Sequence, residues 1–207
     1  MAGGLFLPMG GLQKTSVRSD IVAQAATGDV ARDVPQKASR GMDRSAPQAA
    51  APAQQAAPQG PLLHVTPVGG LSQAQMDNAA IIVAVGGKMY LPAEAKIAAV
   101  MCSLQETRLL NLASGVLPDS LALPNQGVGW DHDSVGLFQQ RPNWGTVPEL
   151  LNPEYAATAF YKVLVTIPNW WAMPLTYAIQ SVQVSAFPEA YAKHEALARQ
   201  IVTALRA

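Results

Sequence analysis

Apolar side chains begin to recur at helical spacing soon after residue 70, and polar residues mark where the helices should begin and end. Ser72 and Gln75 have the spacing of a capping box, in which each side chain bonds the backbone N–H of the other residue. Two adjacent glycines, Gly86 and Gly87, provide a signal for the helix to stop. The pattern therefore predicts a helix over residues 73–85.

A second helix is predicted from Pro92, because proline favours the first turn of a helix, where its missing N–H would have no partner. Ile97 and Leu104 lie at helical spacing on an apolar face, and the pattern continues to about Leu109. Glu106 falls near the C-terminal end of this helix, which is otherwise apolar.

Residues 111–149 are rich in Gly, Pro, Asn and Asp and show little periodicity, so we expect a long functional loop or a small hairpin there. Asn152 and Pro153 then have the order of a helix cap and a first helical residue. Pro174 and Pro188 are expected to open two further short helices. The predicted fold class is mainly α, a compact helical domain that carries a long loop.

The composition of the chain changes sharply near residue 61. Residues 46–61 consist only of Ala, Pro, Gln and one Gly, which cannot form a core. Residues 1–45 hold few aromatic side chains and mix Gly, Ser, Asp and Arg. The sequence therefore predicts a largely disordered N-terminal arm over residues 1–45, a linker over residues 46–68 and a folded domain over residues 69–207.

The charges and the metal-binding residue types limit the classes of function. Lys plus Arg and Asp plus Glu both number 14, so the chain lacks the basic surplus that drives nucleic-acid binding. Cys102 is the only cysteine, which excludes an internal disulfide and a thiolate-rich zinc site. His132 lies between two aspartates, but His64 and His194 are distant in sequence. We expect no nucleic-acid partner, no metal and no other cofactor.

The N-terminal residues and the apolar runs bear on where the protein acts. Residues 1–12 place no Lys or Arg before their short apolar patch, which does not match a secretory signal peptide. The apolar run over residues 79–85 is far shorter than the roughly 18 residues that span a bilayer. We expect no membrane span and no standard signal peptide, so that action on a cell wall would need another route of delivery.

Glu106, in the sequence Leu-Gln-Glu-Thr, is the first candidate for chemistry. Surrounding apolar groups disfavour the ionised form of a carboxyl group, as a general acid that works near neutral pH requires. The alternative is a solvated surface carboxylate, the usual state of Glu at a helix end. The local sequence alone favours that alternative.

A second candidate segment runs over residues 131–141, with the sequence Asp-His-Asp-Ser-Val-Gly-Leu-Phe-Gln-Gln-Arg. Two carboxylates, Asp131 and Asp133, precede a compact turn, so polar groups and backbone amides lie beside an apolar anchor. Such an arrangement suits a polar substrate. The alternative is a surface loop followed by a short buried segment, with Ser134 capping the turn.

The combination of Glu106 with the later Gly-Leu-Phe-Gln at residues 136–139 resembles the soluble lytic transglycosylases and goose-type lysozymes. In those families Glu-Ser and Gly-Leu-Met-Gln line the cleft that binds peptidoglycan. Residues 133–142, followed by Trp-Gly, also look like lysozyme-like domains common in actinobacteria and their phages. So do Asn-Pro-Glu-Tyr-Ala at 152–156 and Gln-Val-Ser-Ala-Phe-Pro-Glu-Ala-Tyr at 183–191.

This resemblance implies an α+β lysozyme-like fold that cleaves peptidoglycan glycan strands, with Glu106 as general acid. Thr107 stands where the transglycosylases usually have Ser, and their later Ala-Tyr-Asn-Ala-Gly segment is missing. Asp131 and Asp133 precede the Gly-Leu-Phe-Gln segment, where goose-type lysozymes also have a carboxylate, and are the other catalytic candidates. The residues expected to bind substrate are Thr107, Ser134, Gly136, Leu137, Phe138, Gln139, Gln140, Trp144 and Gln183.

Three outcomes remain open from the sequence. In the transglycosylases one Glu acts first as acid and then as base, and the product closes to an anhydro-sugar. The goose-type lysozymes use water, which an aspartate positions; a carboxylate separation of roughly 6.5–9.5 Å would favour an inverting hydrolase. The third is a catalytically inactive cell-wall-binding protein, or a phage virion or tail protein, in which residues 1–60 contact other virion or tail proteins.

Overall fold

A computed structural model describes residues 65–184 and 187–206, which belong to one compact unit of the chain. The arm predicted over residues 1–45 and the linker up to residue 64 lie outside the described residues. Within the described ranges helices predominate, which confirms the predicted mainly helical class. The elements are α1 (Gln73–Lys88), α2 (Ala93–Thr107), β1 (Ala113–Ser114), α3 (Pro118–Leu121), β2 (Val128–Gly129), the 3-10 helix η1 (Pro142–Trp144), α4 (Val147–Leu150), α5 (Pro153–Leu164), the 3-10 helix η2 (Trp170–Ala172), α6 (Leu175–Gln183), the 3-10 helix η3 (Pro188–His194) and α7 (Glu195–Ala204).

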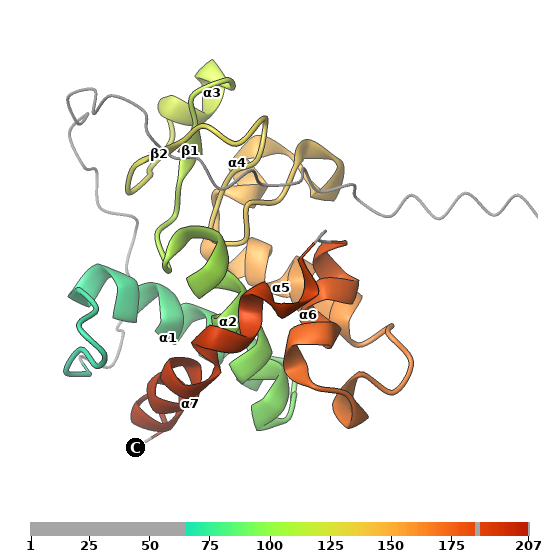
Figure 1. Ribbon diagram of the computed structural model, residues 1–207. Helices are drawn as coiled ribbons and strands as arrows, with labels where there is room; N and C mark the ends of the chain where they lie inside the picture. The colour runs from blue at the N-terminus through green and yellow to red at the C-terminus, as the bar shows by residue number, and fades with distance from the viewer. Residues whose placement is uncertain (1–64, 185–186, 207) are drawn as a thin grey trace, which may run out of the picture. The chain divides into compact units, whose positions relative to one another are not determined.

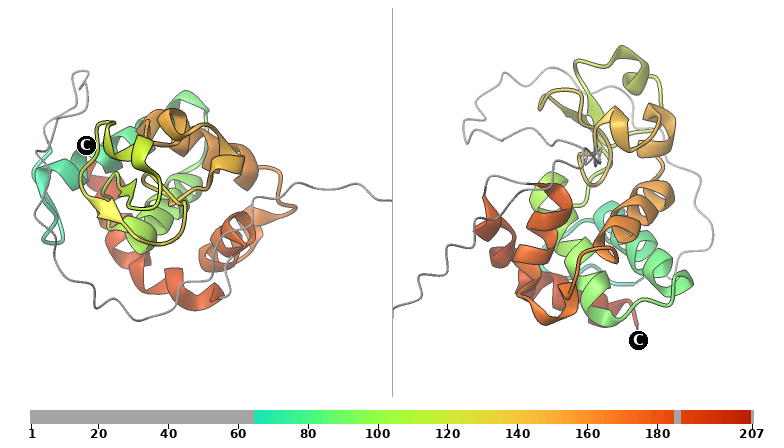
Figure 2. Two further views of the ribbon diagram at one scale, coloured as in Figure 1. Left: turned by 90° about the horizontal axis from the view of Figure 1, so that it is seen from above. Right: turned by 90° about the vertical axis from the view of Figure 1, so that its right-hand side faces the viewer.

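Helix α2 runs through the middle of the helical part, with α1, α5, α6 and α7 packed around it (Figure 1, Figure 2). Its sequence is apolar on most sides, as expected for a helix that neighbours bury in several directions. Ile97, Met101 and Leu104 are buried in the main core together with side chains from those four helices. Helix α2 therefore carries Glu106 into the interior of the protein.

Helix α1 begins as predicted but ends later. Both bonds of the capping box are present, from Ser72 N–H to Gln75 Oε1 at 2.8 Å and from Gln75 N–H to Ser72 Oγ at 3.3 Å. The predicted stop at Gly86 is wrong, because α1 continues through it. A Cβ atom on Gly86 would lie 2.8 Å from Lys96 Cγ and 3.0 Å from the Tyr161 hydroxyl, so this glycine permits close packing of α1 against α2 and α5.

The two strands among the described residues pair in parallel, so this sheet is not the hairpin predicted as one form of the long loop. The antiparallel pairing described in this region is an isolated bridge between Val135 and Gln140. Strands β1 and β2 align Ala113 with Val128 and Ser114 with Gly129. Parallel strands need a crossover between them, and this crossover contains α3. The Ser120 hydroxyl, on α3, fixes the crossover by accepting a hydrogen bond from the Ser114 N–H at 2.9 Å.

The helices after the loop follow the predicted starts with one correction. Helix α5 begins at Pro153, and the Asn152 side chain accepts a hydrogen bond from the Glu154 N–H at 2.9 Å, as a cap should. Helix α6 directly follows Pro174. The α-helix predicted to open at Pro188 is instead η3, which α7 continues. Turns of 3-10 helix are common at the N-termini of α-helices, and no sequence signal separates them from α-helical turns.

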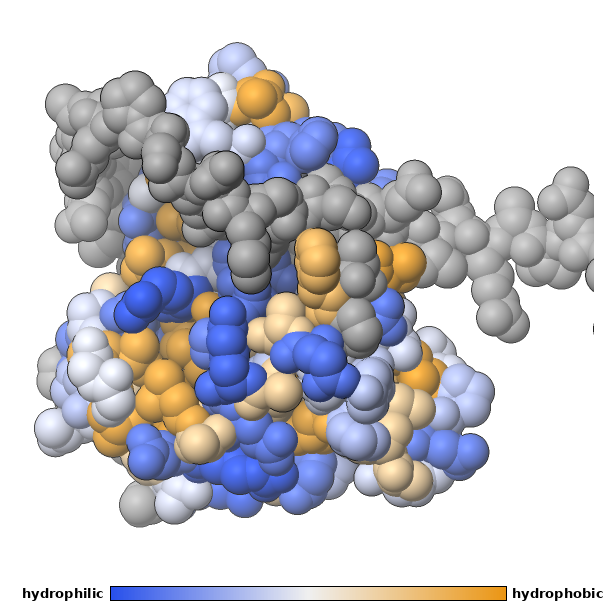
Figure 3. Space-filling view, viewed as in Figure 1, coloured by the Kyte–Doolittle hydropathy of each residue, from blue (hydrophilic) through white to orange (hydrophobic). Residues whose placement is uncertain are grey.

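The surface of the helical part mixes polar and apolar residues (Figure 3). Helix α7 buries Ala198, Ile201 and Val202 and turns Arg199 and Gln200 to solvent. Among the residues that the structure describes, no helix combines the length and the hydrophobicity that crossing a bilayer requires.

Candidate functional site

Glu106 lies in the last turn of α2 and is only 2% exposed. Arg108 and Leu109 adopt left-handed backbone conformations, with φ of 55° and 64°, so α2 ends at Thr107 and the chain turns away there. The carboxyl group of Glu106 is enclosed by other parts of the chain. The interpretation that the local sequence favoured, a solvated surface carboxylate, is therefore wrong.

Two side chains from the C-terminal part of the chain bond the Glu106 carboxyl group. The Tyr191 hydroxyl, on η3, donates to Oε1 at 3.1 Å. Gln183 Nε2, at the end of α6, lies 3.4 Å from the same oxygen. Both residues are 2% exposed. Gln183 was predicted as a site residue, whereas Tyr191 belongs to the 183–191 segment and was not predicted to take part in the site.

The Gly-Leu-Phe-Gln segment is tied directly to the residues around Glu106. Thr107 Oγ1 lies 3.1 Å from the carbonyl oxygen of Leu137, and Gln183 Nε2 lies 3.2 Å from that of Phe138. The Phe138 ring stacks on Phe160 of α5 with the ring centroids 5.1 Å apart. Leu137 and Phe138 are fully buried in the main core. Their side chains hold the segment in place, and any contact that they make with substrate stays a prediction.

Gly136 allows the close approach that this segment needs. Its φ is +77°, and a Cβ atom would lie 2.2 Å from the carbonyl oxygen of Leu150. Its own N–H donates to the carbonyl oxygen of Leu112 at 2.8 Å. Only glycine combines this backbone conformation with so close a neighbour. The structural requirement at Gly136 is therefore independent of any substrate.

Gln139 and Gln140 are buried and their amides bond the protein itself. Gln139 Nε2 donates to the carbonyl oxygen of Gly136, and Gln140 Nε2 to that of Ala156, each at 3.2 Å. The backbones of Val135 and Gln140 bond each other at 2.9 and 3.0 Å. The segment thus closes into a tight turn. Binding of substrate by either glutamine stays a prediction.

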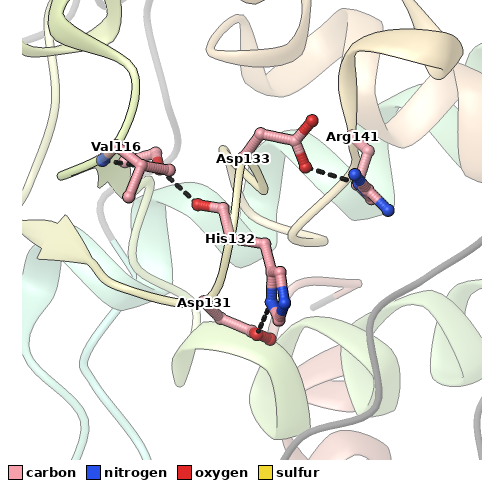
Figure 4. Close-up of polar contacts among 6 residues, drawn as sticks. Val116, Asp131, His132, Asp133 and Arg141 are labelled. Carbon is pink, nitrogen blue, oxygen red and sulfur yellow. Dashed lines mark hydrogen bonds and ion pairs between the residues drawn. The ribbon is translucent and has the colours of Figure 1, made fainter.

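Asp131 and Asp133 each contact a neighbouring basic side chain (Figure 4). Arg141 Nε donates to Asp133 Oδ1 at 2.5 Å, and this bond, together with the charge of Asp133, raises the pKa of Arg141. Asp131 Oδ1 lies 2.9 Å from His132 Nδ1. Ser134, the next residue, is buried. Both carboxylates take part in holding this loop, and their catalytic role stays a prediction.

Trp144 is half-buried where two hydrophobic clusters meet. It packs against the main core and against the smaller cluster of Val135, Leu150 and Leu151. The Tyr155 hydroxyl donates to the Trp144 carbonyl oxygen at 3.2 Å. This placement gives Trp144 a packing role, and its predicted sugar contact is a separate expectation.

His194 lies beside the site, with Nε2 3.0 Å from Oε1 of Gln105, the residue before Glu106. Burial lowers the pKa of His194 below its ordinary value of 6.5, and the charges of Lys193 and Arg108 lower it further. Well above that ordinary value the ring is neutral in both the folded and the unfolded chain. As the pH falls below it, the unfolded chain takes up the proton first, so the folded state loses stability.

We therefore expect the His194→Gln chain to lose less thermal stability than the parent between about pH 7 and pH 5. The amide of Gln can still donate to Gln105 but does not titrate. Thermal unfolding of both chains across that pH range measures the difference. An equal fall in both chains would show that other groups cause the acid destabilisation.

Comparisons of the chain with known protein families and with curated proteins found no match. In residues 65–184 and 187–206, no three His, Cys, Asp or Glu side chains lie together as a metal site would require. The geometry around Glu106 is therefore the basis for assigning a function.

Proposed function

We propose that the chain is a peptidoglycan-cleaving glycosidase with a lysozyme-like fold, and that Glu106 is its general acid. The observation that carries the proposal is that three distant segments meet at one buried carboxyl group: α2 with Glu106, α6 with Gln183 and η3 with Tyr191. Gln183 also joins this group to Phe138 of the Gly-Leu-Phe-Gln segment. Burying a carboxyl group is costly, and such groups cluster at active sites.

In the proposed reaction Glu106 donates its proton to the glycosidic oxygen between N-acetylmuramic acid and N-acetylglucosamine while the bond from that oxygen to the anomeric carbon breaks. The ionised Glu106 then takes a proton from the hydroxyl group that attacks the anomeric carbon, which regenerates the acid. Tyr191 and Gln183 donate to Oε1 and so stabilise the negative charge that appears between the two steps.

We propose that the attacking group is the C6 hydroxyl of the muramic acid residue, which closes an anhydro-sugar ring. This route uses one carboxyl group for both proton transfers. It fits the contacts of Asp131 with His132 and of Asp133 with Arg141, which engage both aspartates in the loop. Attack by water would need one of these aspartates to position the water instead.

The depth of Glu106 favours a second candidate function. A general acid must reach the glycosidic oxygen, whereas Glu106 is 2% exposed. A chain whose carboxyl group serves only the packing of α2, α6 and η3 would bind the cell wall, or act as a virion or tail component, without cutting glycan strands.

Mass analysis of the muropeptides that the full chain releases from purified peptidoglycan tests the proposal. We expect products that end in anhydro-muramic acid, which lack one water relative to hydrolysis products. Reducing-end products would keep the glycosidase assignment but assign an aspartate to the water. Sedimentation of the chain with peptidoglycan without any released product would favour the second candidate.

A further inference from the structure

Trp130 is a large apolar side chain on the surface of the segment that follows β2. It follows β2 directly and is 65% exposed. Trp170, in contrast, is buried in the main core, as a tryptophan with only a packing role would be. An exposed tryptophan beside a polar site is typical of binding surfaces, because its ring offers a wide apolar face and an N–H donor.

The Trp130 ring packs against Gly115. Three atoms of its six-membered ring lie 2.4, 2.5 and 2.7 Å from the position that a Cβ atom on Gly115 would occupy. Gly115 follows β1 and donates its N–H to the carbonyl oxygen of Gly129 at 2.8 Å. The absence of a side chain at Gly115 therefore lets the indole lie against the backbone of the sheet while most of it stays exposed.

A series of contacts links β2 to the residues around Glu106. A Cβ atom on Gly129, the residue before Trp130, would lie 3.3 Å from Gln139 Oε1. Gln139 follows Phe138, whose carbonyl oxygen bonds the Gln183 amide that also reaches Glu106. The sheet that carries Trp130 thus packs on the same turn that is bonded to the candidate acid.

A polar pair lies directly after the indole. Asp131 Oδ1 lies 2.9 Å from His132 Nδ1, and the His132 side chain is 63% exposed (Figure 4). The carbonyl oxygen of His132 accepts a hydrogen bond from Ser114 Oγ at 2.7 Å, which holds this residue against β1. An aromatic face and, two residues later in the chain, an imidazole bonded by Asp131 match the two kinds of surface on a pyranose, its C–H face and its hydroxyl edge.

We propose that Trp130 is a stacking platform for a sugar ring of a glycan strand, with His132 as a neighbouring hydroxyl contact. This subsite rests on the proposed function, because its occupant is the strand that Glu106 would cut. It extends binding from the candidate acid onto the loop after β2.

The test measures binding of the full chain to oligosaccharides of β-1,4-linked N-acetylglucosamine and to purified peptidoglycan. The Glu106→Gln chain is used so that the ligand stays intact. Adding Trp130→Ala is expected to weaken binding by about tenfold, and Trp130→Phe to retain most of the affinity because the aromatic face remains. Thermal unfolding checks that each chain is folded.

Trp171→Ala is the matched control. Trp171 is also 65% exposed, but it lies in η2, between α5 and α6, away from β1 and β2 (Figure 1). Its replacement is expected to leave the affinity unchanged. Equal affinity of the Trp130→Ala chain and its parent, or an equal loss at Trp171, would overturn the subsite.

The outcomes separate this subsite from the proposed reaction. If the parent chain releases no product but Trp130→Ala still weakens glycan binding, the reaction fails and the subsite stands. If the parent chain cuts peptidoglycan and Trp130→Ala binds as the parent does, the subsite fails and the reaction stands. If no chain binds glycan, the subsite is overturned, and the release of muropeptides alone decides the reaction.

Discussion

Replacing Glu106 with Gln is expected to stop the release of muropeptides, with a fall in rate on the order of 10²- to 10⁴-fold, because the amide cannot donate a proton to the glycosidic oxygen. The fold should survive this change. Gln has nearly the same shape, and its amide oxygen can still accept the Tyr191 hydroxyl bond that now reaches Oε1 at 3.1 Å. Release rates from purified peptidoglycan, with thermal unfolding of the same samples, measure both effects.

The matched control for this change is Glu154→Gln. Glu154 lies in the first turn of α5, and its side chain is 62% exposed. Its ion pair with Lys88 lies at the surface. The same chemical substitution there should leave release unchanged, since exposed ion pairs contribute little to stability. Release by the Glu106→Gln chain at the parent rate would remove Glu106 from the reaction.

Local signals account for the parts of the fold that the sequence predicted well. The start of α1 depends on Ser72 and Gln75, and the start of α5 on Asn152, and in both places the side chain bonds a backbone N–H within a few residues. Such bonds need no information from distant parts of the chain. Helix starts of this kind can therefore be predicted from sequence.

Tertiary contacts account for what the sequence could not predict. Gly86 has the appearance of a helix stop, but Lys96 and Tyr161 decide its role by packing against it. The strands β1 and β2 contain two residues each, too few to show an alternating pattern. Their parallel pairing depends on the α3 crossover rather than on any feature of the strands themselves.

The candidate acid lies between these cases. The local sequence of Glu106 favours a surface carboxylate, and only its combination with the Gly-Leu-Phe-Gln segment marked it for chemistry. Its burial and the Tyr191 bond arise because three distant segments meet. A binding role for Trp130 was not predicted either, since its ring packs against Gly115 only when β1 and β2 pair. Site residues that are brought together by tertiary contacts can be identified only from the folded structure.

Gly136→Ala is expected to have the largest effect on stability. The substitution places a methyl group 2.2 Å from the Leu150 carbonyl oxygen and imposes a φ of +77° on an L-residue. Because the neighbour is backbone, it cannot rotate away, and we expect a loss of about 3 kcal/mol or more. Thermal unfolding should show a fall of roughly 10 °C in Tm.

The same substitution at Gly87 is expected to act in the opposite direction. Gly87 lies within α1, and a Cβ atom there would meet nothing within 4 Å. Alanine loses less conformational entropy than glycine on folding, so Gly87→Ala should stabilise the chain by about 0.5–1 kcal/mol. Both variants add one methyl group, so opposite shifts in Tm would separate the contact at Leu150 from any general effect of the substitution. A Gly136→Ala chain that unfolds at the parent temperature would show that the turn over residues 135–140 can move away from α4, and that Gly136 is not needed to hold the segment beside Glu106.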